Sequence, residues 1–311
     1  MEKIQETNAN TEIENSAAKK KRRRRLGDRY DGRRVRSLDP MCYVAPFIMK
    51  DRNDSSNLFR SSLDMEPIND YIRHKTRVEG LEGFGFMHVI VAAYIRVVAS
   101  HPGLNRFIAG QRIYSRDEVI LSMMVKKTMS LNAQESAIKP SFLPSENIYD
   151  VYRKMQDEIA VARKEGDTTA LDTVARVIVK LPTLLLRGFV GLMKSMDYFG
   201  IMPKIIYKAS PFHASIFISN LGSLGIQPIY HHLYNFGNVP VFITFGALYR
   251  KNEISDDGRV LKKKYIDYTV VTDERITDGH YYADAMKELS RILKNPSVLD
   301  ASPETVVEDI E

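Results

Sequence analysis

The stretch Asp273-Glu274-Arg275-Ile276-Thr277-Asp278-Gly279 decides how the last third of the chain is organised. Two apolar, alternating segments over 239–248 and 265–271 precede it and predict strands. The residues after it keep helical spacing, so we expect a helix over 280–293 with Asp278 as its N-cap. The stretch is therefore predicted to be a strand-to-helix loop.

A second informative segment lies upstream of this loop. It reads Ile218-Ser219-Asn220-Leu221-Gly222-Ser223-Leu224-Gly225-Ile226. On a strand, Phe217 and Ser219 point to one side and Ile216 and Ile218 to the other, which gives the Ser219 hydroxyl a definite side. Because no Gly-Lys-Ser/Thr follows the two glycines, we interpret them as a turn and not as a phosphate loop.

Together these two segments resemble the catalytic domain of the 2-oxoacid dehydrogenase acyltransferases, whose fold chloramphenicol acetyltransferase shares. An apolar helix over Met87–Ala99, followed by Pro102-Gly103-Leu104-Asn105, supports the resemblance. It covers about 38–295 and implies an α/β chloramphenicol acetyltransferase-like two-layer sandwich, with a large mixed sheet flanked by helices. It also implies a homotrimer with active sites at subunit interfaces that admit coenzyme A from one side.

The resemblance also implies roles for individual residues. In the family, a His-x-x-x-Asp-Gly loop supplies the general base, and here Glu274 occupies the histidine position. Ser219 of the neighbouring subunit would hold the oxyanion, and Asp278 would fix the loop by pairing with an arginine. The residues expected to shape the two segments are Asn220, Gly222, Arg275 and Gly279.

The change from histidine to Glu274 leaves the chemistry open. A free glutamate titrates near 4.3 and a histidine near 6.5, so the glutamate is the weaker base by roughly 3 kcal/mol of proton affinity. Desolvation strengthens a carboxylate as a base, whereas a neighbouring cation such as Arg275 would keep it ionised. His280 or His213 could also supply a base from a different backbone position.

Two classes of function therefore remain. The first is a coenzyme A-dependent acyltransferase that uses acyl-CoA as co-substrate, holds no permanent cofactor, and acylates a hydroxyl, thiol or amine. The second is a catalytically inactive trimer that serves as a binding or scaffold protein. Because 1–37 is too short for a lipoyl domain, we expect a free-standing form and not the core of a dehydrogenase complex.

The charge of the chain is concentrated at one end. Residues 1–36 hold 12 Lys/Arg and 6 Asp/Glu, which accounts for the whole net charge of +6. We expect 1–37 to be a disordered basic tail whose run over 19–25 could make weak contacts with an anionic membrane or nucleic acid. The early glutamates and the lack of an apolar secretion segment predict a cytoplasmic protein.

Composition and residue spacing limit the structures and chemistry that we expect of the remaining segments. We expect an apolar helical insertion at about 167–207, whose cations exclude a bilayer span. It packs normally, packs on a partner subunit or lies in a membrane interface. Residues 296–311 are predicted to form an acidic C-terminal tail. The single cysteine, Cys42, excludes an internal disulfide, and adjacent histidines at 231–232 point to opposite faces of a strand, so we expect no metal site.

Sequence patterns also predict the elements of the first half. We expect a strand over Met41–Met49, a second over Asn57–Ile68 that leads into a helix, and paired strands at Gln111–Tyr114 and Val119–Val125. An amphipathic helix is predicted over Ile148–Lys164.

Overall fold

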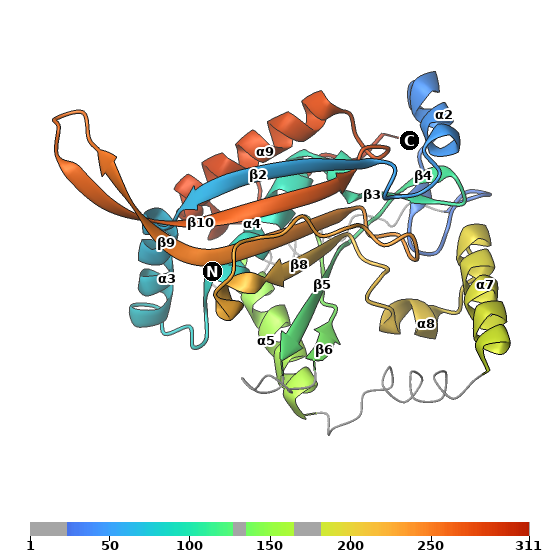
Figure 1. Ribbon diagram of the computed structural model, residues 1–311, viewed down its shortest axis with the longest axis horizontal. Helices are drawn as coiled ribbons and strands as arrows, with labels where there is room; N and C mark the ends of the chain where they lie inside the picture. Colours follow the sequence, from blue (N-terminus) through green and yellow to red (C-terminus); the bar gives the residue numbers. More distant parts are fainter. Residues whose placement is uncertain (1–23, 127–134, 165–181, 311) are drawn as a thin grey trace, which may run out of the picture.

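The centre of the molecule is a mixed β-sheet, seen face-on in Figure 1. The computed structural model describes residues 24–126, 135–164 and 182–310. Within them the sheet has the order β2-β10-β9-β8-β5-β6, with β7 pairing β5; β8 is parallel to β5 and β9, and the other pairs are antiparallel. The strands are β2 (Ser56–Asp64), β5 (Val119–Lys126), β6 (Glu135–Ile138), β7 (Ser141–Phe142), β8 (Ile216–Asn220), β9 (Val241–Ile254) and β10 (Val260–Asp273).

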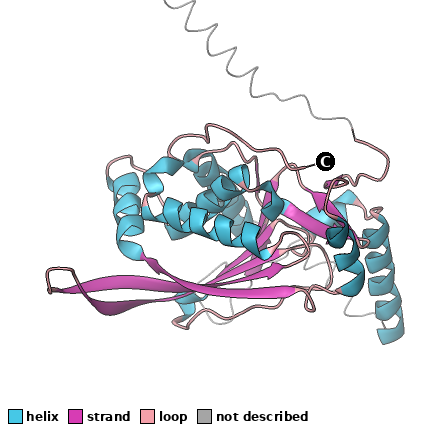
Figure 2. Cartoon of the chain, turned by 90° about the horizontal axis from the view of Figure 1, so that it is seen from above, coloured by secondary structure: helices cyan, strands magenta, loops and turns pink. Residues whose placement is uncertain are grey.

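Helices cover one face of this sheet, as Figure 2 shows. They are α3 (Met65–Arg77), α4 (Phe86–Ser100), α5 (Ile148–Lys164) and α9 (Gly279–Lys294). Three further helices, α2 (Pro40–Ile48), α7 (Thr183–Phe199) and α8 (Lys204–Ala209), lie toward one end, near a small sheet of β1 (Arg33–Arg34), β4 (Arg112–Ser115) and β3 (Arg106–Ala109). Short 3₁₀ turns follow α4, β8 and α9 at η1 (Pro102–Asn105), η2 (Leu221–Leu224) and η3 (Pro296–Leu299). The result is a two-layer α/β molecule.

The alternation of side chains along β8 separates two apolar clusters. Ile216 and Ile218 belong to the large core between the sheet and its helices. Phe217 lies on the other face, in a small cluster with Ala214, Leu233, Val239, Phe242 and Val271. Residues 221–240 connect β8 to β9 and supply Leu233 and Val239 to this cluster. The expected alternation of this strand is thus confirmed.

The helix and strand predictions around the loop are confirmed as well. The predicted strands over 239–248 and 265–271 are the inner parts of the long hairpin β9–β10. Asp278 is the N-cap of α9, where its side chain accepts a hydrogen bond from the Tyr281 backbone N–H. The helices predicted at Met87–Ala99 and Ile148–Lys164 are α4 and α5.

Two predictions in the first half were wrong, and one predicted strand is shorter than expected. The apolar run at 41–49 is not a strand but helix α2, which begins with the N-cap Asp39 and with Pro40 in the first turn. The strand predicted at 57–68 ends at Asp64, because Asp64 caps α3 and Pro67 fits its first turn. The strands near 112 and 119 do not pair: β4 pairs with β3 and β1, and β5 pairs with β6, β7 and β8.

Both described ends of the chain contact the domain. Arg29 pairs with Asp31 and Asp197, so the segment from 24 to 36 is held against α7. Near the C-terminal end, Asp309 receives two hydrogen bonds from Arg106 at 2.8 and 2.5 Å. Asp300 lies 2.9 Å from the ammonium of the buried Lys75. The described residues of the basic and acidic end segments therefore take part in the folded structure.

Candidate functional site

A buried ion pair anchors the loop 273–279. The Arg275 guanidinium donates to both carboxylate oxygens of Asp273, at 2.8 and 2.7 Å, and its side chain is 2% exposed. Arg275 also donates to the carbonyls of Met49 and Lys50, and the Ser55 hydroxyl donates to Asp273. Two-pronged arginine–carboxylate contacts of this kind fix geometry as well as adding energy. The loop backbone is therefore held firmly at the end of β10.

Glu274, between these two residues, points the other way. Its backbone N–H donates to the carbonyl of Ser55 at 2.8 Å, which fixes the backbone. Its side chain is exposed and contacts no charged group among the described residues. Arg275 pairs with Asp273 instead of Glu274. The loop thus presents a carboxylate outward from a rigid base.

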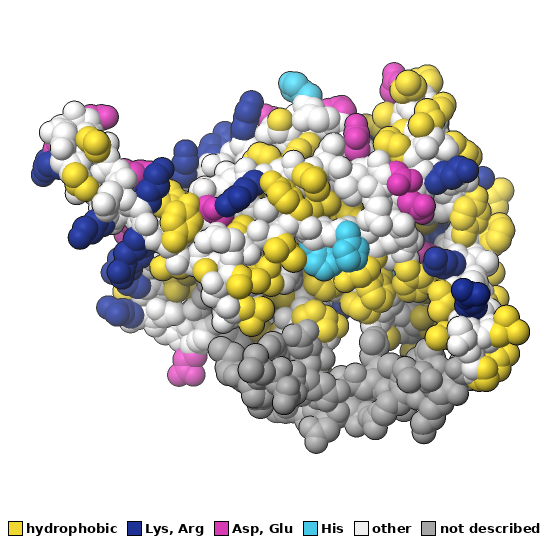
Figure 3. All heavy atoms as spheres, in the orientation of Figure 1, with side chains coloured by type: hydrophobic (Ala, Val, Ile, Leu, Met, Phe, Trp, Pro, Cys, Tyr) yellow, Lys and Arg dark blue, Asp and Glu magenta, His cyan; other side chains and the backbone are white. Residues whose placement is uncertain are grey.

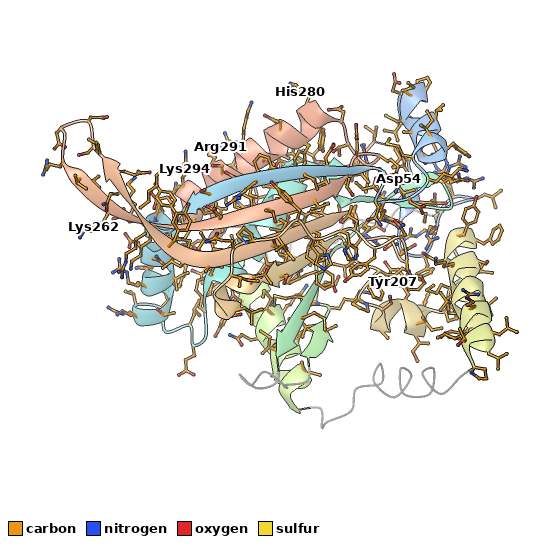
Figure 4. All side chains as sticks on the ribbon, viewed as in Figure 1. Asp54, Tyr207, Lys262, His280, Arg291 and Lys294 are labelled. Carbon is orange, nitrogen blue, oxygen red and sulfur yellow. The ribbon has the colours of Figure 1, made fainter. Side chains whose placement is uncertain are left out.

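The far end of the loop starts α9. Asp278 accepts from the Tyr281 N–H at 2.8 Å, and this is a helix cap, whereas Asp273 makes the ion pair with an arginine. A Cβ at Gly279 would meet no atom within 4 Å, so no close contact requires glycine there. His280 is exposed on the first turn of α9 and points away from the sheet (Figure 4).

Ser219 lies near the end of β8, on the sheet face opposite the helices. Its side chain is half-buried, and its register partner on β9 is Thr244. The turn that follows is tightly built: the Asn220 side chain accepts from the Gly222 N–H at 3.0 Å. A Cβ at Gly222 would come within 2.7 Å of the Gly246 carbonyl oxygen, so this position has room only for glycine.

Ser219 and Glu274 do not meet within one chain. Ser219 is in register with Thr244, and Thr244 with Thr269, so Glu274 is two strands across and five residues along from Ser219. At about 4.8 Å per strand and 3.3 Å per residue, the separation is on the order of 19 Å. A site that uses both side chains needs a second copy of the chain.

His213 lies in the interior and not at the loop. It is fully buried, with Nδ1 at 2.8 Å from the Ser210 hydroxyl and Nε2 at 3.4 Å from Asp197. Burial lowers the pKa of His213. Burial opposes ionisation of Asp197 too, but His213 and the Arg29 guanidinium lower the pKa of that carboxyl to about 2. We therefore assign His213 to the junction of α7 with the domain.

A second buried arginine lies between this junction and the loop. Arg52 is fully enclosed and donates to the carbonyls of Ile108 and Tyr234. Burial lowers its pKa to about 10, while Asp273 on one side and Asp197 on the other favour its charge. Charges at the loop and at α7 thus influence the same guanidinium.

No group of three His, Cys, Asp or Glu side chains suited to a metal ion occurs in the described parts of the chain. The prediction that His231 and His232 point to opposite faces of a strand was wrong: they lie in the connection between β8 and β9, and their rings stack with centroids 4.6 Å apart.

Sequence reasoning missed Asp273 and Ser55. β10 ends at Asp273 and Arg275 lies in the turn that follows, so the only signal for their pairing was two opposite charges placed two residues apart. Ser55 lies 218 residues before Asp273 in the sequence, and no local pattern indicates their contact.

Part of the chain is similar to a known protein family. Residues 212–300 match the family model described as 2-oxoacid dehydrogenases acyltransferase (catalytic domain). A search of curated protein sequences gave no significant match. The matched region holds Ser219, the hairpin, the loop 273–279 and α9.

Solved structures share the fold. A probable dihydrolipoamide acetyltransferase from Listeria monocytogenes superimposes with a TM-score of 0.54 at 13% identity, covering 91% of this chain and 100% of that chain. A truncated catalytic core of the 2-oxoacid dehydrogenase multienzyme complex from Thermoplasma acidophilum gives a TM-score of 0.50 at 11% identity, covering 84% and 98%. The predicted chloramphenicol acetyltransferase-like mixed α/β fold is therefore confirmed.

Proposed function

We propose that this protein is a coenzyme A-dependent acyltransferase whose active site forms between two copies of the chain in a homotrimer. Glu274 of one subunit and Ser219 of its neighbour would face each other across the interface. The observation that carries the proposal is the loop itself: a buried ion pair positions the backbone and leaves one carboxylate exposed. The match of residues 212–300 to an acyltransferase model supports the same assignment.

The open face of the sheet supports an interface between copies. The turn and connection after β8 carry exposed apolar side chains, and so does β9. They are Leu224, Ile226, Ile229, Tyr230 and Leu248, each about half exposed. Figure 3 shows apolar surface over the centre of this face. Packing against a neighbour would remove it from water and would bring a foreign Glu274 toward Ser219.

Each residue then has a role in transfer. Glu274 would take the proton of the acceptor hydroxyl, thiol or amine as that group attacks the thioester carbonyl of acyl-CoA. The Ser219 hydroxyl has no hydrogen-bond partner among the described residues and would donate to the oxyanion that forms. Carboxylates become stronger bases as they lose water, so enclosure by the neighbour suits Glu274 to this task.

Binding and turnover of acetyl-CoA test the proposal. Wild-type protein should bind acetyl-CoA in a calorimetric titration, and Glu274→Gln should bind it nearly as well while losing about 10²–10⁴-fold in acyl transfer. Glu274→His should remain active, with a rate that follows an imidazole titration instead of a carboxyl titration. A Gln variant as active as wild type would remove Glu274 from the mechanism.

Mixed oligomers test the interface. Glu274→Gln and Ser219→Ala proteins should each be weak, but co-expressed subunits should recover part of the activity, because some interfaces then join an intact Glu274 to an intact Ser219. Acyl-transfer activity should recover only when mixed oligomers form. Purification of oligomers that carry two different subunit tags shows that they have formed. Mixed oligomers without recovery would place the site elsewhere.

The alternative is a non-catalytic trimer that serves as a binding or scaffold protein. Glutamate at the base position favours it. Failure of correctly folded trimers to bind acetyl-CoA or longer acyl-CoAs would favour this second function.

A further inference from the structure

Helix α7 exposes its apolar side chains instead of burying them. Of the residues from Thr183 to Phe199, only Met193 and Asp197 are buried. Leu184 is 79% exposed, Leu192 56% and Phe199 72%. Ile201 and Ile205, in the link to α8 and in α8 itself, are also mostly exposed.

The four most exposed apolar residues of α7 share one side of the helix. At about 100° per residue, Leu184, Leu185, Leu192 and Phe199 fall within an arc of about 100°. Met193 and Asp197 lie on the opposite side, where they contact the domain. One side of the helix therefore packs inward and the other forms an apolar stripe.

Cations accompany this stripe, and exposed anions do not. Arg187, Lys194, Lys204 and Lys208 are exposed on α7 and α8. The single acidic residue between 182 and 210 is Asp197, which is buried against Arg29 and His213. Figure 3 shows α7, at the lower right, with hydrophobic and dark-blue side chains. The β9–β10 hairpin also exposes apolar side chains and cations, but it exposes Asp256 and Asp257 as well, and the apolar residues of α2 lie beside the exposed Asp39 and Asp51.

The helix is fixed in place. Arg29 donates to the Asp197 carboxylate and to its backbone carbonyl, at 2.8 and 2.5 Å. Tyr198 donates to the Gln111 side chain at 3.1 Å. The stripe is therefore presented by a rigid support.

We propose that the outer side of α7 and α8 binds the surface of an anionic lipid membrane. Apolar side chains with flanking Lys and Arg are the features of helices that lie in the membrane interface, and the cations attract acidic headgroups. No helix in the described ranges is long and apolar enough to cross a bilayer, so the contact is peripheral. The exposed cations select an anionic surface over an uncharged one.

Vesicle flotation of the full-length protein tests this assignment. Protein should float with phosphatidylcholine vesicles that contain phosphatidylglycerol, should not float with phosphatidylcholine alone, and should be released by salt. The double variant Leu192→Ser/Phe199→Ser should lose at least about tenfold in affinity. Lys194→Ala should lose about fivefold.

Matched controls separate this surface from others. Ile254→Ser/Val260→Ser removes two exposed apolar residues from the β9–β10 hairpin and should bind like wild type. A full-length variant with serine in place of the Lys and Arg residues at 19–23 should keep α7-dependent binding.

Three results would overturn the proposal. The first is a failure of the wild-type protein to bind anionic vesicles. The second is vesicle binding that depends on residues 19–23 and not on Leu192 and Phe199. The third is a change in the oligomeric mass of the Leu192→Ser/Phe199→Ser variant, measured by light scattering. The last would make the stripe a contact between protein subunits.

Discussion

The loop 273–279 and the α7–α8 segment use similar residues in opposite ways. In the loop, the arginine is buried, doubly paired and structural, and the glutamate points outward. In α7, the aspartate is buried and paired, while arginine, lysine and leucine side chains point outward. The loop fixes the position of the Glu274 carboxylate, whereas α7 presents an extended surface of apolar and cationic side chains. Removing charge should therefore damage the loop, whereas removing apolar groups from α7 should leave the fold intact.

The largest expected effect is at Arg275. Arg275→Ala leaves the Asp273 carboxylate buried without its partner, which should cost about 3–5 kcal/mol of unfolding free energy. Urea unfolding measures this loss. The exposed pair Arg259–Asp257 on the hairpin is the control, and Arg259→Ala should leave the unfolding free energy nearly unchanged. Equal losses in both variants would contradict the structural role of the loop pair.

A smaller effect is expected at the turn after Ser219. Gly222→Ala would press a Cβ against the Gly246 carbonyl, at 2.7 Å, and should cost about 1–3 kcal/mol. Gly279→Ala, in the first turn of α9, should be neutral or slightly stabilising, since nothing lies within 4 Å and alanine favours helices. Thermal unfolding of the two variants gives the comparison. A Gly222→Ala variant as stable as the Gly279→Ala variant would show that the turn has room for a side chain.

Lys139 tests how firmly the α8 end is joined to the sheet. Its ammonium donates to the carbonyls of Tyr207 and Ser210, and burial, together with nearby Arg116, lowers its pKa to about 7. Between pH 7 and the unfolded value near 10.5, the unfolded chain holds the proton and the folded chain does not, so stability rises with pH. Below pH 7 both forms are protonated and this slope disappears.

The prediction is tested by comparing the pH dependence of the unfolding free energy in wild type and in the Lys139→Met variant. From pH 7 to 9, wild type should gain about 1–2 kcal/mol relative to Lys139→Met, because the variant lacks the titrating group. Urea unfolding at the two pH values provides it. Parallel pH dependence in the two proteins would mean that Lys139 stays hydrated.

The smallest effect is expected on α7. Leu192→Ala should change the unfolding free energy by less than about 0.5 kcal/mol, because the side chain is 56% exposed. Leu289→Ala, on α9, removes a side chain that is 4% exposed and should cost about 2–5 kcal/mol. A large loss at Leu192 would show that the stripe is covered in the folded protein.

Local patterns predicted the second half of the molecule well. The alternation on β8, the cap at Asp278 and the spacing along α9 are short-range signals, and each corresponds to an observed element. The apolar run at 41–49 failed because a short run without clear periodicity fits a strand or a helix equally. The cap and proline signals at Asp39 and Pro40 would have decided the question.

Contacts between distant segments were beyond prediction. The leucines of α7 look like core residues in the sequence, but the burial of Met193 and of Asp197 against Arg29 turns their side outward. The enclosure of His213 and Arg52 likewise depends on several segments at once. The proposed site joins Glu274 to Ser219 of a second chain, which no pattern within one chain specifies.

The parallel pairing of β8 has a consequence for the order of folding. Residues 127–215 separate this strand from β5, and residues 221–240 separate it from β9, so neither partner is a hairpin neighbour. Closing such long loops precedes any gain from pairing, and sheets built this way form slowly. The β9–β10 hairpin with its loop can assemble early and locally, whereas Ser219 takes its place only when the centre of the sheet closes. The two halves of the proposed site are thus expected to mature at different times.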